Sequence, residues 1–225
     1  MAIVTTEASL LRLLQLSSVS LPVGGYAFSQ GMEYAIDQGW VKNKADVSNW
    51  IGLQIQQSVA RVDLPVLRLC IAAASQQDTV RLLELNDLAL ACRETKELRL
   101  NDTAMGEALA RLMGSLAIET PFERLQDISF VTLFAIAANH WKMDFGLAAL
   151  GFTWSWLENQ IAAATKLVPL GQTQAQELLG ELQGDINQAI ALSMTIEEDR
   201  IGAGLPTIAI ASAMHETQYS RLFRS

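Results

Sequence analysis

Cysteine and histidine are scarce in this sequence. It has two cysteines, Cys70 and Cys92, and two histidines, His140 and His215, among 225 residues. The cysteines form neither a CxxC pair nor the dense pattern of a disulfide-stabilised secreted domain. Soft and borderline metals need cysteine and histidine at ligand spacing, so no tight metal site is predicted within one chain. A transient metal site shared between subunits stays an open alternative.

Basic residues are also in short supply. There are 16 lysines and arginines against 24 aspartates and glutamates, which gives a net charge of −8 and a pI near 4.8. Nucleic acids and anionic membranes select basic surfaces, so neither is an expected partner. The first residues, MAIVTTEASLLRLL, lack the basic start of a secretory signal peptide, and apolar runs such as 130–138 are too short to span a bilayer. A cytoplasmic location is therefore expected.

Catalytic motifs are missing as well. The glycines at 24, 25 and 31 are not followed by the lysine of a phosphate-binding loop, and the GAG at 202–204 is not a dinucleotide fingerprint. No GxSxG nucleophile elbow occurs, and neither histidine has the context of a catalytic base. The acidic run 197–199 is typical of a solvated loop. We expect no enzymatic activity and no cofactor; a helical enzyme with an unrecognised pocket stays the alternative.

Helical patterns dominate what is present. Half of the residues are hydrophobic and 18% are charged, and no segment of any length shows the period-two alternation of a half-buried strand. No repeat or low-complexity linker divides the chain. The sequence predicts one all-α domain over 1–225, a bundle of about ten helices. A first helix is expected after Thr6 and Glu7, and a second over 29–40. Further helices are expected from Asp46 towards Arg61, from a start at 63–65, and from Asp78 to about 99. The remaining ones are expected over 103–118, 121–139, 146–166, 172–195 and 205–215.

Two loops, a helix end and the last residues carry most of the distinctive polar and aromatic side chains. The loop 20–31 combines glycines with Tyr26, and the loop 196–206 is acidic and then glycine-rich. Lys166 lies where a helix C-terminus favours a positive charge. The mixed-charge stretch 92–99 is typical of a solvated face, with Arg93 and Glu97 paired at i,i+4. The final segment, 215–225, reads HETQYSRLFRS and is rich in tyrosine and arginine, the residue types enriched at interface hot spots.

Four of these stretches, in this order, resemble the urease accessory protein UreF family. They are LLQLSSVSLPVGGYAFSQGMEYAIDQGWV, ACRETKELR, WLENQIAAATKLVPLGQT and HETQYSRLFRS, and together they extend from about residue 11 to residue 225. The resemblance implies an all-helical, non-catalytic protein that forms a homodimer. It also implies a cytoplasmic complex with UreD (also called UreH) and the GTPase UreG, which delivers nickel to apo-urease. In this complex UreF bridges UreD and UreG and regulates GTP-dependent nickel transfer.

The resemblance also implies which residues contact partners. The final segment is similar to the family's C-terminal interaction tail, which orders on UreD and helps to recruit UreG. We hypothesise that Arg221 folds back onto Tyr26 and fixes this tail. The turn at EDRIGAGLP departs from the family pattern, and His140 is given no role. The implied partner-binding residues are Tyr26, Glu33, Lys166, His215, Glu216, Tyr219, Arg221, Leu222 and Phe223.

Two alternatives remain at this stage. The chain could be an independent nickel metallochaperone, although its shortage of cysteine and histidine argues against that. A regulator of a GTPase could insert a charged finger into the active site, or it could hold the GTPase in one conformation. The sequence does not choose between these two modes.

Overall fold

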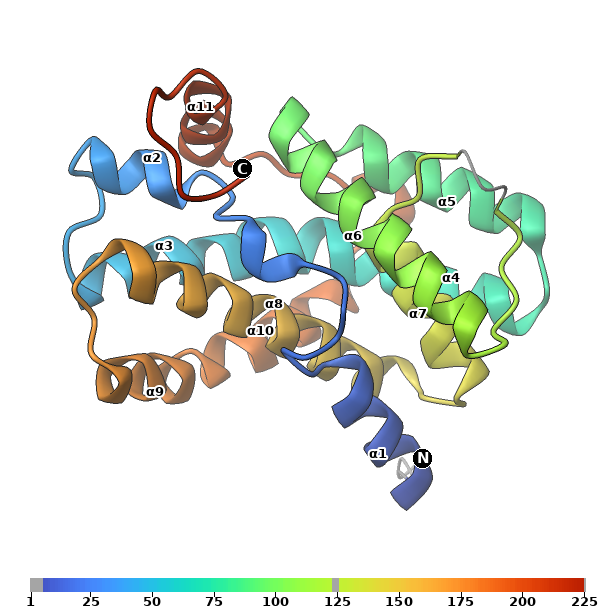
Figure 1. Ribbon diagram of the computed structural model, residues 1–225. Coiled ribbons are helices and arrows are strands. Elements are labelled where there is room, and N and C mark those ends of the chain that lie inside the picture. Colours follow the sequence, from blue (N-terminus) through green and yellow to red (C-terminus); the bar gives the residue numbers. More distant parts are fainter. Residues whose placement is uncertain (1–5, 123–125, 225) are drawn as a thin grey trace.

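The computed structural model describes residues 6–122 and 126–224, and within them every regular element is helical (Figure 1). The all-α prediction is confirmed; the division into a single domain with an interaction tail stays a prediction. The α-helices are α1 (Glu7–Leu16), α2 (Met32–Asp37), α3 (Lys44–Gln54), α4 (Leu64–Ser75), α5 (Thr79–Ala91), α6 (Lys96–Ser115), α7 (Phe130–His140), α8 (Phe145–Leu167), α9 (Gln172–Glu181), α10 (Gln183–Ser193) and α11 (Pro206–His215). Short 3-10 turns, η1 (Gly25–Ala27) and η3 (Glu198–Arg200), and a π-helical segment, η2 (Ile55–Asp63), complete the fold.

Helix α7 forms the centre of the molecule. Its residues 130–138 are all buried, and it packs against α4 and α6. A helix that is apolar on every side needs neighbours on every side, and this accounts for the apolar run in the sequence. In the described part of the chain, no helix combines the length and the apolarity that crossing a bilayer requires.

Helices α3 and α4 are joined without a break through η2. The sequence predicts a helix start at 63–65, and α4 does begin at Leu64, but Asp63 already has helical backbone angles (φ −64°, ψ −48°), so α4 continues from η2. The cap of α3 is Asn43, whose side chain accepts the backbone N–H of Asp46, so the predicted cap at Asp46 is wrong. Pro65 lies in the first turn of α4, where a proline is tolerated.

Three other predicted boundaries are wrong. The helix expected from Asp78 to about 99 is broken at residues 92–95, where the Thr95 hydroxyl accepts the Leu98 N–H and starts α6. The helix expected over 121–139 begins only at Phe130. The segment 172–195 is divided at Leu182, which has φ −82° and ψ −2°.

The chain reverses direction after α11 and passes back towards α2. We call residues 216–224 the tail. Figure 1 shows the tail and α11 on one side of the molecule, and α1 on the side away from them. The backbone N–H of Arg224 donates to the carbonyl oxygen of Ala27 over 2.9 Å, so the end of the tail lies against the glycine-rich loop. The predicted tail also includes Ser225, which lies outside the described residues.

Candidate functional site

Helix α11 approaches α2 and α6 closely through small side chains. Gly31, just before α2, has a left-handed φ of +83°, and a Cβ at this position would lie 3.0 Å from the Ser212 backbone nitrogen. Only glycine suits both the angle and the approach. The hydroxyl of Ser212 is 2.7 Å from that of Thr95, which ties α11 to the start of α6. As a result, the last residue of α11, His215, lies at the first turns of α2 and α6.

His215 is held between two carboxylates. Its Nδ1 atom is 2.8 Å from Glu97 Oε2, and its Nε2 atom is 3.0 Å from Glu33 Oε2. The exposed fraction is 0% for His215, 6% for Glu33 and 4% for Glu97. We call these three residues the tail clamp. Burial raises the pKa of the Glu97 carboxyl, although the hydrogen bond from His215 opposes this shift.

The tail closes over the clamp. Glu33 Oε1 accepts the backbone N–H of Leu222 over 2.7 Å, and Glu33 Oε2 accepts the N–H of Phe223 over 3.0 Å. The Nη1 atom of Arg221 donates to Glu97 Oε1 over 3.1 Å. Hydrogen bonds to a charged acceptor are stronger than neutral ones, so Glu33 fixes the backbone of the last residues and Glu97 fixes the Arg221 side chain.

A second set of contacts fixes the Phe223 side chain, which is buried although it is two residues from the end of the chain. The Nζ atom of Lys166, in the last turn of α8, lies 5.5 Å from the centre of the Phe223 ring and 5.9 Å from that of Tyr26. Both distances are within the range of a cation–π interaction. Lys166 therefore joins the glycine-rich loop to the tail.

The outer face of the docked tail is apolar and aromatic. Tyr219 is fully exposed, Leu222 projects outwards while its backbone is held by Glu33, and Tyr26 presents much of its ring to solvent. Ile210 and Met214 of α11, the helix that precedes the tail, are exposed as well. We call this face the tail surface, and it comprises Tyr26, Ile210, Met214, Tyr219 and Leu222.

The structure brings most of the predicted site residues together. Glu33 and His215 belong to the clamp, Arg221, Leu222 and Phe223 bind to it or pack beside it, and Lys166 and Tyr26 adjoin Phe223. Glu216 follows the clamp and is half-buried, and Tyr219 lies on the tail surface. Partner binding by these residues stays a prediction.

Two contacts predicted from the sequence are wrong. Arg221 binds Glu97 and does not bond to Tyr26; it is Lys166 that lies over the Tyr26 ring. The stretch 92–99 is solvated in part, since Glu94, Lys96 and Arg99 are exposed, but Arg93 is not paired with Glu97. The backbone is broken at 92–95, which removes the i,i+4 geometry, and both side chains turn inwards to other partners.

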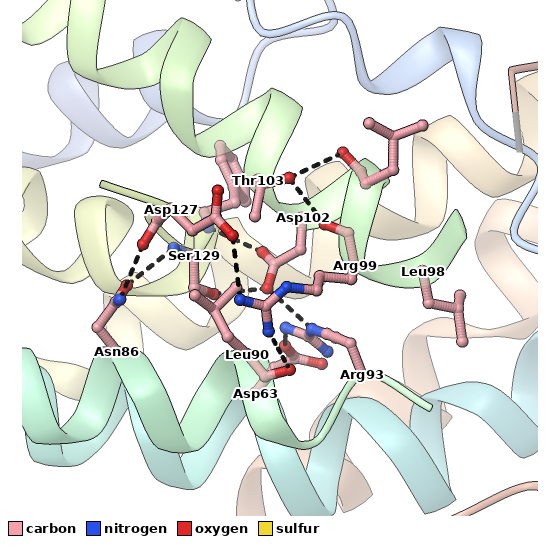
Figure 2. Close-up of polar contacts among 12 residues, drawn as sticks. Asp63, Asn86, Leu90, Arg93, Leu98, Arg99, Asp102, Thr103, Asp127 and Ser129 are labelled. Carbon is pink, nitrogen blue, oxygen red and sulfur yellow. Dashed lines mark hydrogen bonds and ion pairs between the residues drawn. The ribbon is translucent and has the colours of Figure 1, made fainter. Parts of the chain in front are cut away.

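Arg93 forms the centre of a buried polar network (Figure 2). Its Nη2 atom donates to Asp63 Oδ1 over 2.6 Å, and its Nε atom donates to Asp102 Oδ2 over 2.8 Å. Asp102 also accepts the hydroxyl of Ser129 and the backbone N–H of Phe130. Burial raises the pKa of Asp63, against the effect of Arg93. Burial alone lowers the pKa of Arg93, but the carboxylates of Asp102 and Asp63 raise it by more.

A small cavity of about 90 Å³ lies beside this network. Asp63, Arg93 and Asp102 line part of it, and the Oδ1 atom of Asn101 is buried there without a hydrogen-bond partner. In the described part of the chain, no group of three or more histidine, cysteine, aspartate and glutamate side chains is arranged to hold a metal ion. The chemistry of the tail site is recognition of a peptide segment by buried carboxylates.

Sequence reasoning missed Glu97 as a site residue. It lies in the run RETKE, in which charges of both signs alternate, and such runs are usually solvated. One signal was available: Thr95 is a helix N-cap residue type, and a glutamate in the first turn after it is favoured by the helix dipole. That signal places the helix start correctly, but it does not reveal that the glutamate faces His215.

Comparison with known proteins identifies relatives over nearly the whole chain. A model of the UreF family matches residues 41–183. A protein of Marinomonas sp. strain MWYL1 is 81% identical over 223 residues, which cover 99% of this chain and 97% of the relative. Proteins of Alkalilimnicola ehrlichii and Hahella chejuensis are 43% and 44% identical, over 95% and 96% of this chain and 95% and 98% of their own lengths. All three relatives are named urease accessory protein UreF.

Proposed function

The chain belongs to the UreF family of urease accessory proteins, and from this premise we propose that it is a non-catalytic factor in urease maturation. In this proposal it bridges UreD (UreH) and the GTPase UreG in a cytoplasmic complex and regulates the GTP-dependent delivery of nickel to apo-urease. The supporting observation is the tail, which buried carboxylates hold in a fixed shape while the side chains of Tyr219 and Leu222 face outwards.

The tail surface has the composition of a binding hot spot. Tyrosine and arginine are enriched at the energetic centres of interfaces, and a segment that is fixed before binding loses less entropy when it binds. The side chain of Tyr219 is fully exposed, so packing within the described part of the chain does not explain why a tyrosine occupies this position. A tyrosine held in this way fits a pocket on a partner.

Two basic side chains lie close to the tail surface in a protein whose net charge is −8. Lys166 lies over the rings of Phe223 and Tyr26, and Arg224 lies 5.7 Å from the centre of the Phe28 ring. Such cations on an acidic protein favour approach by an acidic partner surface and steer its orientation. We propose that the partner contacting the tail surface presents carboxylates around an apolar pocket.

A separate face supports the proposed homodimer. Leucines of α1 are exposed beside a groove of about 380 Å³ between α1, α8 and α10. None of the described residues that line this groove is titratable, so two copies of an acidic chain can meet there with little charge repulsion. Figure 1 shows α1 away from the tail, which leaves the tail surface free in such a dimer. The groove is lined by Leu13, Leu14, Ser17, Leu150, Gly151, Trp154, Gln183, Ile186 and Asn187.

Sedimentation of two charge variants tests this dimer. Leu14→Glu places a negative charge in the groove, and Leu53→Glu places one on an exposed position of α3 that lies outside it. The proposal predicts that wild type and Leu53→Glu sediment as dimers and that Leu14→Glu sediments as a monomer. A monomeric wild type, or a dimeric Leu14→Glu variant, would contradict it.

A shortened chain tests the bridging role. A chain that ends at Thr217 loses every tail residue that Glu33 and Glu97 bind. We expect the full-length protein to retain UreD and UreG together in a pull-down, and the shortened chain to lose the complex at unchanged helicity by circular dichroism. Equal retention by both chains would overturn the role assigned to the tail.

A further inference from the structure

The tail clamp contains one more proton than its three groups would carry in water above neutral pH. Both ring nitrogens of His215 lie within hydrogen-bond distance of a carboxylate oxygen, at 2.8 Å and 3.0 Å. An ionised carboxylate only accepts hydrogen bonds, and a neutral imidazole has a single N–H. Two hydrogen bonds therefore require either an imidazolium with two carboxylates or a neutral ring with one protonated carboxyl. In both cases the clamp has a net charge of −1.

The neighbouring charges fit this proton count. Arg221 brings one positive charge to Glu97, so the clamp and the Arg221 side chain together are neutral. Glu216, on the same turn as His215, favours a proton on Glu97. Asp37 lines a surface pocket with Glu33 and Arg221, and the Lys166 cation lies over the Phe223 ring. A second net negative charge in the buried clamp would be costly in this setting.

We propose that docking of residues 215–224 takes up one proton, so that the tail is released as the pH rises above neutrality. In the released state His215 and both glutamates are solvated. Solvated histidines lose their proton near pH ~6.5 and solvated carboxyls near pH ~4, so the released clamp has a neutral ring and two carboxylates at neutral pH and above. The docked state binds one proton more. The docking equilibrium then falls by about tenfold for each unit of pH above about 7.

The proposal also predicts how docking of the tail depends on pH in acid. Below about pH 6.5 the released histidine is also protonated, so the difference in bound protons disappears and docking no longer changes with pH. The inference deepens the proposed function, because it concerns the regulation of the tail surface. It depends on that function only for the biological use of the tail.

One conservative variant separates proton linkage from a purely structural role. In Glu97→Gln the side-chain amide can donate its N–H to His215 Nδ1, while the opposite ring nitrogen donates to Glu33. Both hydrogen bonds of the clamp are then satisfied by a neutral ring without the extra proton. The variant loses the charge that Arg221 binds, so docking weakens, but its dependence on pH disappears.

Amide hydrogen exchange on the isolated full-length protein measures docking directly. The N–H groups of Leu222 and Phe223 donate to Glu33, so their protection, after correction for the intrinsic rate, reports the closed tail. The N–H of Leu147 is a matched control, because the Asp144 carboxylate accepts it over 2.9 Å far from the clamp. The wild-type tail should lose about tenfold in protection per pH unit between about pH 7 and 8.5, while Leu147 stays constant.

Each result of this experiment decides the inference. A steep loss in the wild type with a flat profile in Glu97→Gln supports it. A flat wild-type profile, an equally steep profile in the variant, or a tail without protection at any pH overturns it. No partner is present in the exchange measurement, so a negative result does not bear on the bridging role that the pull-down tests. Likewise, a negative pull-down does not bear on the proton linkage.

Discussion

Replacement of Arg93 by methionine should lower the free energy of unfolding by about 3–5 kcal/mol, the usual cost of breaking a buried ion pair. Methionine keeps much of the length of the side chain but has no N–H groups. The variant therefore leaves the carboxylates of Asp63 and Asp102 inside the protein without their cation. The loss of packing is small by comparison, because the two residues have similar shapes.

The two carboxylates do not contribute equally to this cost. Asp102 keeps its bonds from the Ser129 hydroxyl and the Phe130 N–H, at 2.7 Å and 2.8 Å. Among the described side chains, only Arg93 bonds to Asp63. Most of the penalty therefore arises at Asp63, and Asp63→Asn in the Arg93→Met background should recover part of it.

The penalty should also depend on pH. Burial raises the pKa of Asp63 even with Arg93 beside it, so the carboxyl that the variant leaves unpaired holds its proton more tightly in the folded state than in the unfolded chain. Above about pH 4 the folded variant then binds more protons than the unfolded chain, and its stability falls as the pH rises. We expect a larger penalty at pH 8 than at pH 5.

Urea unfolding, followed by circular dichroism, measures these changes. Arg99→Met is the matched control, since Arg99 pairs with Asp127 over 3.0 Å at the surface, where their exposed fractions are 44% and 62%. A surface pair of this kind is worth about 0–1 kcal/mol. If Arg93→Met cost no more than this control, the network in Figure 2 would not be the buried, charged centre described here.

Three further predictions concern other parts of the fold. Gly106→Ala should cost about 1–3 kcal/mol or more in urea unfolding, because a Cβ there would lie 1.9 Å from the Ile128 carbonyl oxygen. Burial raises the pKa of the Cys70 thiol to about 12, so a thiol reagent at pH 8 should modify it only when the protein is unfolded by urea. Lys166→Met removes the cation from the Phe223 ring and should weaken tail docking by about 0.5–1 kcal/mol, measured by amide exchange.

The sequence was a good guide wherever a local signal decides the structure. Thr6 and Asp78 cap helices as their position indicated, with their side chains accepting the N–H groups of Ser9 and Arg81. The all-α architecture followed from periodicity alone. The resemblance to a known family also identified Glu33 and the last residues, which the structure brings together.

The errors arose where a distant residue decides the outcome. Arg93 and Glu97 are close in sequence and opposite in charge, so a surface pair was the natural interpretation. Their actual partners, Asp63 and His215, are 30 and 118 residues away. Local patterns contain no information about such partners, and burial of charge depends entirely on them.

The most direct test of the central claim uses Tyr219, the tail residue whose side chain is fully exposed. Tyr219→Ala cannot disturb tail docking through lost contacts, because its side chain is fully exposed, and Val80→Ala on α5 is the exposed control. The quantity to measure is the affinity of the protein for UreD and UreG in the assembled complex. A hot-spot tyrosine predicts a loss of about 2 kcal/mol or more, about thirtyfold in affinity, with the control unchanged. Equal affinities for wild type, Tyr219→Ala and Val80→Ala would contradict the account of the tail as the recruiting surface.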